Sequence, residues 1–321
     1  MYDKLIKAIF KIKNTNDFEL LALEVYRYQY KENNVYREFC QLILKTPDQV
    51  KKLLDIPFLP IAFFKTQQVI CGNKEILKSF SSSGTMSHST SKHHLTDLSI
   101  YKTSFSKGFK MFFPNYEKVS IIALLPSYME RDDSSLVYMV NDLIKNSNGI
   151  KSGFYKKLNS ETLDYLTNDP APKILIGVSF ALLELAESKI QLKNTKVIET
   201  GGMKGMRKEL IRQELHETLQ KGLDISKIHS EYGMTELLSQ AYLTDENFQC
   251  PPWMKTLARD VTDPMSVSTI GKGAINVIDL ANLNSCSFIG TDDLGEIFPD
   301  GTFDVKGRLD HSLARGCNLL V

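Results

Sequence analysis

Apolar side chains in the first fifty residues follow a helical pattern. They recur at intervals of three and four residues, as on one face of an α-helix, for example Phe18, Leu21, Ala22, Val25 and Tyr26. Several amphipathic helices are therefore expected over residues 2–54. The next segment, residues 56–64, places two prolines among bulky apolar residues, which favours an extended, buried connector.

Beyond the connector, short apolar runs alternate with helical patterns. Strand-like runs occupy residues 119–125, 173–178, 196–200 and 228–232, and helix-like stretches occupy residues 135–144, 180–190 and 206–220. Strands that alternate with helices predict a largely parallel sheet covered on both faces. From about residue 266, short β-like segments split by turns predict a small antiparallel subdomain. The expected organisation is a helical layer over residues 1–70, an α/β core over 71–265 and a β subdomain over 266–321.

Composition narrows the classes of function. The chain has 321 residues and a formal net charge of +1, so nucleic acid or a membrane surface is not expected as a partner. We find no apolar run of about 18 residues and no signal peptide, so we expect a cytoplasmic protein without integral membrane association. The five cysteines include no CxxC pair, and we interpret them as reduced thiols outside any structural zinc site.

The first candidate for chemistry is the serine-rich segment FSSSGTMSHSTSKHH, residues 80–94. Its hydroxyls and backbone N–H groups are the donors that a polyphosphate needs, although it is not a Walker A loop. The alternative is a flexible surface loop. His88, His93 and His94 have no carboxylate or thiolate neighbours in this segment, so we expect them to be solvated and not to bind metal.

The second candidate is HSEYGMTEL, residues 229–237, at the end of an apolar strand, where α/β folds collect ligand groups. Tyr232 can lie against a purine, Thr235 can donate to a phosphate, and Glu236 can hold a magnesium ion. The alternative is a strand end with a glycine turn and a helix cap.

The third candidate is GTDDLGEIFPDGTFDVKGRLD, residues 290–310. The carboxylate of Asp293 can accept both hydroxyls of a ribose, and the guanidinium of Arg308 can donate to the same sugar or to phosphate. The alternative is a β-hairpin whose aspartates and glycines make turns.

Taken in order, these segments resemble the signature set of the adenylate-forming superfamily. Further runs, among them IPFLPIAFFK, LLPSYMERDDSSLVYM, ETGGMKG and RGCNLL, make residues 56–321 similar to the acyl-protein synthetase family of bacterial luminescence, which ligates fatty acids to protein. The resemblance implies an α/β fold, the large N-terminal-type domain of adenylate-forming enzymes. Mostly parallel sheets flanked by helices and a small antiparallel β subdomain are expected, without the mobile C-terminal domain.

The resemblance also implies roles for individual residues. The loop that closes over the triphosphate would be Ser82, Ser83, Gly84 and Thr85. The adenine pocket would be lined by Gly201, Gly202, Glu231, Tyr232, Gly233 and Met234. Thr235 would contact the α-phosphate, Glu236 would bind Mg²⁺, and Asp293 with Arg308 would hold the ribose. The sequence departs from the family pattern at Met86 and Ser87, where a Thr-Gly pair is usual.

Transfer of an acyl group would require one further residue to carry it and a pocket for the acid. Members of the resembled family carry it on a cysteine near the C-terminus, and Cys317 occupies that place. A thiolate attacks an acyl-adenylate readily, although the alternative is a small packed cysteine. We expect the acid beside residues 124–129 and 177–183, with Phe180 and Ala181 near its carboxylate, unless these apolar runs only fill the core.

The expected function is ATP- and Mg²⁺-dependent activation of a carboxylic acid, which the resemblance implies is a fatty acid. Transfer to a cysteine thiol and delivery to an acyl-accepting protein partner would follow. Two alternatives stay open from the sequence. One is a ligase that passes the acyl group to coenzyme A or a carrier thiol, as phenylacetate-CoA ligase-like enzymes do. The other is a nucleotide-binding subunit that needs a partner for activity.

Overall fold

Amphipathic helices form the N-terminal layer. A computed structural model describes residues 2–82, 90–126, 131–202 and 210–309. The layer contains α1 (Tyr2–Ile9), α2 (Thr15–Glu32), α3 (Asn34–Leu42) and the 3₁₀ turn η1 (Leu53–Asp55). The predicted apolar face of α2 is buried, and Asn33 caps α3 by accepting a hydrogen bond from the N–H of Tyr36 at 2.9 Å. The helical pattern is therefore confirmed.

The proline-containing connector is extended only in its first part. Strand β1 (Leu59–Pro60) pairs in parallel with β14 (Phe288–Ile297), which ties the N-terminal layer to the far end of the chain. The prediction of an extended segment is wrong at Phe63 and Phe64, because these residues begin the short helix α4 (Phe63–Thr66). No proline follows Pro60 in this stretch, so nothing prevents a helical turn there.

The middle of the chain builds a parallel half-sheet in the order β5-β4-β6-β7-β8. Its strands are β4 (Ser120–Leu124), β5 (Gly153–Tyr155), β6 (Lys173–Val178), β7 (Thr195–Thr200) and β8 (Ile228–Tyr232). Every residue of β4 and β6 is buried, as expected when helices cover both faces. The four predicted strands are confirmed.

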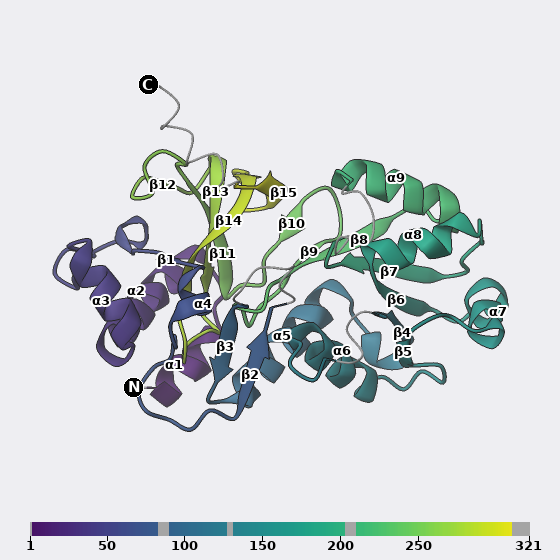
Figure 1. Cartoon of the computed structure of the whole chain (residues 1–321), viewed down its shortest axis with the longest axis horizontal. Coiled ribbons are helices and arrows are strands. Elements are labelled where there is room, and N and C mark those ends of the chain that lie inside the picture. The colour runs from purple at the N-terminus through teal and green to yellow at the C-terminus, as the bar shows by residue number, and fades with distance from the viewer. Residues whose placement is uncertain (1, 83–89, 127–130, 203–209, 310–321) are drawn as a thin grey trace, which may run out of the picture.

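Helices cover both faces of this half-sheet, as Figure 1 shows. One face carries α8 (Ser179–Glu187) and α9 (Arg212–Leu223), and the other carries α5 (Leu98–Phe112) and α6 (Ser135–Lys145). Helix α7 (Ser160–Asn168) lies at the end of the sheet. The 3₁₀ turn η2 (Tyr116–Lys118) precedes β4. The helix expected over residues 180–190 ends at Glu187, and the helix expected from residue 206 begins at Arg212, with residues 206–209 outside the described part of the chain.

Antiparallel strands continue the same sheet. They are β9 (Ala241–Leu243), β10 (Phe248–Gln249), β11 (Met254–Arg259), β12 (Val267–Ser268), β13 (Gly271–Asp279), β14 and β15 (Phe303–Arg308). Their order is β8-β9-β10-β15-β14-β13-β11-β12, so the described residues form one 13-stranded sheet when β1 is included. Antiparallel pairing begins at β9, earlier than residue 266. A separate ribbon joins β2 (Lys78–Ser81) to β3 (Lys92–Leu95).

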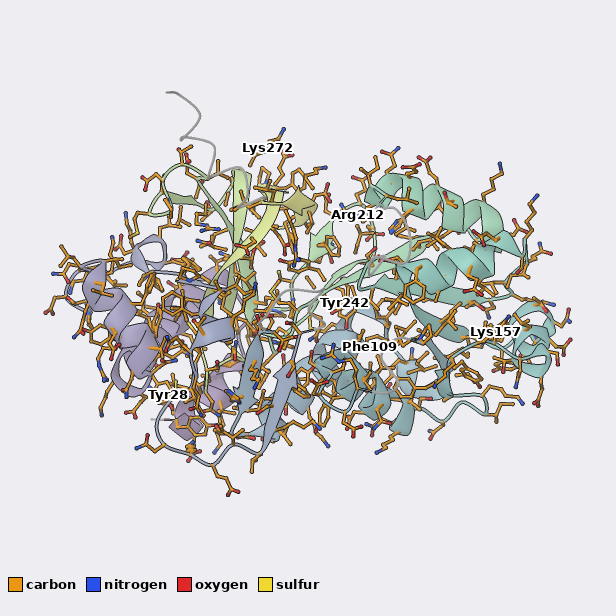
Figure 2. All side chains as sticks on the ribbon, viewed as in Figure 1. Tyr28, Phe109, Lys157, Arg212, Tyr242 and Lys272 are labelled. Atoms are coloured by element: carbon orange, nitrogen blue, oxygen red, sulfur yellow. The ribbon has the colours of Figure 1, made fainter. Side chains whose placement is uncertain are left out.

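An aromatic cluster fills the junction between the two halves of the sheet. The ring of Phe109 on α5 lies 5.9 Å from that of Tyr242 on β9, and Phe113 contacts both. Figure 2 places Phe109 and Tyr242 in the interior, whereas Lys157 and Lys272 point outward. Burial of each such ring contributes about 1.5–3 kcal/mol, so the cluster stabilises the junction between α5 and the sheet. In the part of the chain that the structure describes, no helix combines the length and the apolar character needed to cross a membrane.

Candidate active site

The β2–β3 ribbon frames the serine-rich segment. Ser82 follows β2; its N–H donates to the Ser91 carbonyl, and its hydroxyl accepts from the Ser91 N–H, each at 3.0 Å. Arg131 donates to the Ser81 carbonyl at 2.8 Å and pairs with Asp133. This end of the ribbon is therefore fixed from a second segment. The other predicted loop residues, Ser83, Gly84 and Thr85, as well as Met86, Ser87 and His88, lie outside the described residues.

His93 of β3 is buried, and the expectation of a solvated side chain is wrong for it. Its side chain is 1% exposed. Nδ1 lies 2.8 Å from the carbonyl oxygen of Thr235, and Nε2 lies 3.0 Å from Oδ1 of Asn282. Burial lowers the pKa of His93 to about 4, so the ring is neutral at pH 7. His94, on the opposite face of the ribbon, is partly exposed and bonds to Ser79 at 2.7 Å.

The loop after β8 carries Thr235 and Glu236. Residues 233–240 form turns and no helix, so the helix-cap alternative for this segment is wrong. Glu236 is 5% exposed, and burial raises the pKa of its carboxyl despite a hydrogen bond from Ser91 and the nearby cations of Arg308 and Lys65. A buried carboxylate with so little compensation is a site where a bound cation is stabilised.

A buried carboxylate holds this loop from behind. Asp279, at the end of β13, accepts hydrogen bonds from the N–H of Leu238 at 2.7 Å and the N–H of Ser239 at 2.9 Å. The Ser239 hydroxyl also donates to it at 2.5 Å. Sequence reasoning missed Asp279, because its partners are about 40 residues away along the chain. The loop is consequently rigid just beyond Glu236.

Asp293 joins two of the predicted motifs. Its Oδ2 accepts a hydrogen bond from the Tyr232 hydroxyl at 2.8 Å, and its Oδ1 accepts one from Nε of Arg308 at 2.9 Å. Asp293 and Arg308 are paired across β14 and β15, so the antiparallel register brings them together. The third motif is a pair of strands, as the hairpin alternative predicts, and it also brings Asp293 into contact with Tyr232 of β8.

Tyr232 is mostly enclosed by other rings. It is 8% exposed and lies 5.3 Å from the ring of Phe303 and 5.9 Å from that of Phe248, measured between centroids. Its hydroxyl is committed to Asp293. The predicted role of Tyr232 beside a purine therefore rests on the narrow exposed part of its ring and stays a prediction.

Two glycines after β7 open space beside the backbone. Gly201 and Gly202 have φ angles of +78° and +68°, and a Cβ on Gly202 would meet no atom within 4 Å. The carboxylate of Glu231, on β8, accepts from the Thr200 hydroxyl at 2.5 Å. A Cβ on Gly233 would lie 2.2 Å from Oε1 of Glu231, so any other residue there would have to displace the Glu231 carboxylate. The predicted adenine-pocket residues thus gather around the carboxyl ends of β7 and β8; Met234, partly buried, packs on the core.

A second buried acid lies beneath Glu231. Burial, with a smaller contribution from the neighbouring Glu199, raises the pKa of Glu231 to about 7. Glu199, on β7, accepts hydrogen bonds from Ser179 and Ser230. Sequence reasoning missed Glu199, although an acid at the end of an apolar strand is a signal that could have found it.

Glu236 is the carboxylate that the sequence predicts to bind Mg²⁺. Within residues that the structure describes, no group of three or more His, Cys, Asp or Glu side chains could hold a metal ion. Mg²⁺ commonly binds through one or two carboxylates together with substrate phosphates and water. Glu236 fits that mode, because it is buried beside Ser91 at the ribbon that frames the serine-rich segment.

The described cysteines are poor nucleophiles. Cys40, Cys71 and Cys286 are buried, Cys250 is partly buried, and burial raises the pKa of each thiol. Raised pKa values keep these side chains protonated, whereas the nucleophile must be a thiolate. Cys317 lies outside the described residues.

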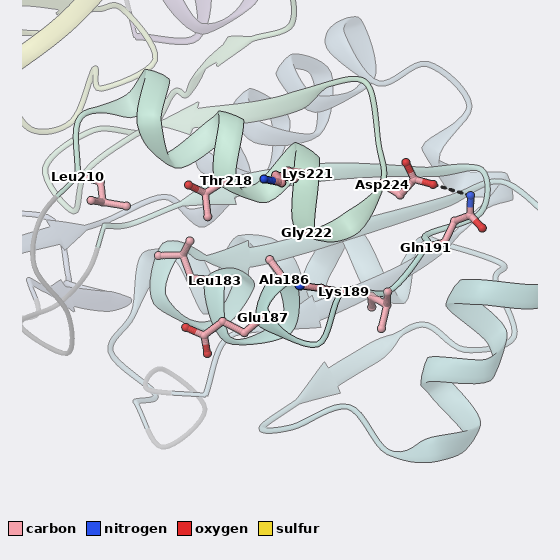
Figure 3. Close-up of a pocket in the computed structure, with 11 residues that line it drawn as sticks. Leu183, Ala186, Glu187, Lys189, Gln191, Leu210, Thr218, Lys221, Gly222 and Asp224 are labelled. Atoms are coloured by element: carbon pink, nitrogen blue, oxygen red, sulfur yellow. Dashed lines mark hydrogen bonds between the residues drawn. The ribbon is translucent and has the colours of Figure 1, made fainter.

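A groove of about 820 Å³ runs between α8 and α9, away from these motifs (Figure 3). It is lined by Leu183, Ala186, Glu187, Lys189, Ile190, Gln191, Leu210, Thr218, Lys221, Gly222 and Asp224. Leu183 is the member of the expected acyl-pocket runs that lines it. Phe180 and Ala181 are buried in α8 elsewhere, and residues 127–129 lie outside the described residues. The location of an acyl pocket therefore stays a prediction.

Solved structures of adenylate-forming enzymes share the fold. A 2-hydroxyisobutyryl-CoA ligase in complex with 2-HIB-AMP and CoA superposes with a TM-score of 0.70 and 12% identity, over 94% of this chain and 77% of that chain. ATP-bound MatB from Rhodopseudomonas palustris gives a TM-score of 0.56 and 17% identity, over 74% of this chain and 49% of that one. The predicted α/β fold class is confirmed.

Sequence comparisons give the family. A long-chain-fatty-acid–luciferin-component ligase from Photorhabdus luminescens is 36% identical over 66 residues, which is 20% of this chain and 56% of that relative's length. The family model described as acyl-protein synthetase, LuxE, matches residues 11–321. The resemblance of the ordered motifs is thereby confirmed across nearly the whole sequence, and the chain belongs to the LuxE acyl-protein synthetase family.

Proposed function

We propose that this chain uses ATP to convert a fatty acid into an acyl-adenylate and then transfers the acyl group to the thiol of Cys317. The observation that carries the proposal is the connected group made by the three motifs. Ser91 beside Ser82 contacts Glu236, Arg308 lies near Glu236 and binds Asp293, and Asp293 binds Tyr232. Segments far apart in sequence thus converge where β7 and β8 end.

In the first step, a carboxylate oxygen of the acid attacks the α-phosphorus of ATP, and the bond to the leaving pyrophosphate breaks. The chain's contribution is positioning and charge stabilisation, since no general base is needed for an ionised acid. Asp293 and Arg308 would hold the ribose, Glu231 and the open backbone at Gly202 would receive the base, and Thr235 would donate to the α-phosphate. Glu236 would hold Mg²⁺, which neutralises phosphate charge when bound.

In the second step, the thiolate of Cys317 attacks the acyl carbon, a thioester forms, and AMP leaves with the electron pair of the broken bond. The four described cysteines have raised pKa values, which supports assigning this role to the fifth. The thioester retains enough reactivity for delivery to an acyl-accepting protein.

The test is covalent labelling with a radioactive fatty acid, ATP and Mg²⁺, read after denaturation. The proposal predicts protein-bound label that neutral hydroxylamine removes, and its loss in Cys317→Ser while ATP–pyrophosphate exchange persists. Cys250→Ser is the matched control and should keep the label. Label that survives Cys317→Ser would contradict the transfer step. Turnover that requires added coenzyme A would instead favour an acyl-CoA ligase.

A further inference from the structure

His93 and Asn282 form a buried polar bridge behind the two residues that the proposed function places on phosphate and metal. His93 belongs to β3, which leaves the serine-rich segment, and Asn282 follows β13. Both side chains are at most 1% exposed. Nδ1 of His93 contacts the Thr235 carbonyl at 2.8 Å, and Nδ2 of Asn282 donates to the Glu236 carbonyl at 2.8 Å. Nε2 of His93 lies 3.0 Å from Oδ1 of Asn282, so the two side chains are in direct contact.

The position of the imidazole is set from several sides. The ring of Phe64, on α4, meets it edge-on at 5.7 Å between centroids. The backbone of β3 is fixed by its register with β2, in which Phe80 is opposite His93. A buried polar ring is costly to desolvate, and an apolar residue would pack there at lower cost if shape were all that mattered. The imidazole instead makes two specific polar contacts.

The position of the ring proton on His93 distinguishes its contact with Thr235 from its contact with Asn282. The Thr235 carbonyl can only accept, so the neutral ring carries its proton on Nδ1. Nε2 then has a lone pair that faces Oδ1 of Asn282, because the amide NH₂ donates to the Glu236 carbonyl. If the amide turned, it would donate to Nε2 but place Oδ1 against the Glu236 carbonyl. Asn282 can therefore donate to one of its two partners at a time, whereas the bond from Nδ1 to the Thr235 carbonyl is present in both orientations. The Thr235 contact is therefore the constant part of the bridge.

We propose that His93 and Asn282 are a positioning pair that fixes the backbone of Thr235 and Glu236 and links it to the strand leaving the serine-rich segment. This inference rests on the proposed adenylation. Neither side chain touches substrate in this role; they act through the two carbonyls. Because a misplacement of about 1 Å can lower a rate about 100-fold, loss of the bridge should affect the chemical step more than acid binding.

Three substitutions of His93 separate the contacts. An asparagine side chain places its amide donor near the position of Nδ1, a glutamine places it near Nε2, and leucine supplies neither. In ATP–pyrophosphate exchange, His93→Leu and His93→Gln should lower kcat about 100-fold, and His93→Asn should stay within about tenfold of the wild type. The KM for the fatty acid should be unchanged in all three. The control for lost stability is Lys173→Met, because Lys173 is buried at the start of β6, whereas the site lies where the parallel strands end. This variant should leave kcat unchanged.

A double-mutant cycle tests the pairing. Asn282→Ala should lower kcat about tenfold, and His93→Leu with Asn282→Ala should be no worse than His93→Leu alone, because both act on one bridge. Equal kcat values for His93→Asn and His93→Gln would overturn the inference, and so would additive effects in the cycle. The comparison of His93→Asn with His93→Gln remains decisive even if the leucine variant does not fold. An inactive wild type would refute the proposed function instead, so the two failures are distinguishable.

Discussion

A substitution of Asp293 can distinguish an effect on ATP use from an effect on the stability of the fold. Its carboxylate is 6% exposed and accepts from the hydroxyl of Tyr232 and from Nε of Arg308. Asp293→Ala removes both acceptors. We expect this change to weaken ATP use far more than it weakens the fold.

The two magnitudes follow from the surroundings. A hydrogen bond to a charged acceptor is worth about 1.5–3 kcal/mol, so loss of the two proposed ribose contacts should cost about 3–6 kcal/mol, or about 150- to 25,000-fold in kcat/KM for ATP. In the folded protein, the buried Tyr232 hydroxyl would lose its acceptor, which costs about 1–3 kcal/mol. The Arg308 side chain is 77% exposed, so its lost ion pair adds little.

The assay pairs ATP–pyrophosphate exchange with urea unfolding for three variants. Tyr232→Phe combined with Asp293→Ala removes the unpaired hydroxyl, so it should recover most of the lost stability while kcat/KM for ATP stays low. Asp300→Asn is the control on the same hairpin, because Asp300 is exposed and bonds to Thr302. The reasoning is refuted if Asp293→Ala keeps kcat/KM for ATP within about twofold, or if the double variant restores it.

Three further changes test other parts of the structure. Burial raises the pKa of Glu231 to about 7 in the folded protein, so the folded state binds a proton more tightly than the unfolded state does. The stability that this proton supplies is lost as pH rises from about 4.5 through 7. In urea titrations, the free energy of unfolding of the wild type, compared with Glu231→Gln, should therefore fall by about 2 kcal/mol between pH 5 and 8. Lys173→Met should cost about 2–4 kcal/mol of stability in the same assay, because the buried ammonium donates to the carbonyls of Asp169 and Ala171 at 2.6 and 2.7 Å. Asp279→Asn should cost about 2 kcal/mol and slow exchange about tenfold, because in either orientation the amide nitrogen would face an N–H that Asp279 accepts from, either those of Leu238 and Ser239 or that of Ala281. Unchanged exchange rates would argue that Asp279 does not support the loop after Glu236.

The fold could be predicted where burial imposes a simple pattern. Strands β4 and β6 are buried on both faces and therefore read as continuous apolar runs, and the buried face of α2 shows helical spacing. The extent of the antiparallel region was underestimated, because β9 and β10 are only three and two residues long. Strands that short carry too little periodicity to be recognised.

The residues of the candidate site also divide into those that the sequence predicts and those that only the folded structure reveals. Glu236, Asp293 and Arg308 stand in compact motifs, so their order in the chain was enough to single them out. His93 contacts Thr235, 142 residues away, and Asn282, 189 residues away. No local pattern distinguishes such a histidine from a solvated one, since its environment is created by segments that meet only in the folded chain.

The central claim is adenylation, and its most direct test is carboxylate-dependent exchange of labelled pyrophosphate into ATP by the purified chain with Mg²⁺. Fatty acids of graded length and a few aromatic acids should be compared under identical conditions. The account predicts exchange that requires an added fatty acid and is lost in Asp293→Ala. An absence of exchange with every acid would contradict adenylation by this chain and favour a nucleotide-binding subunit that depends on a partner.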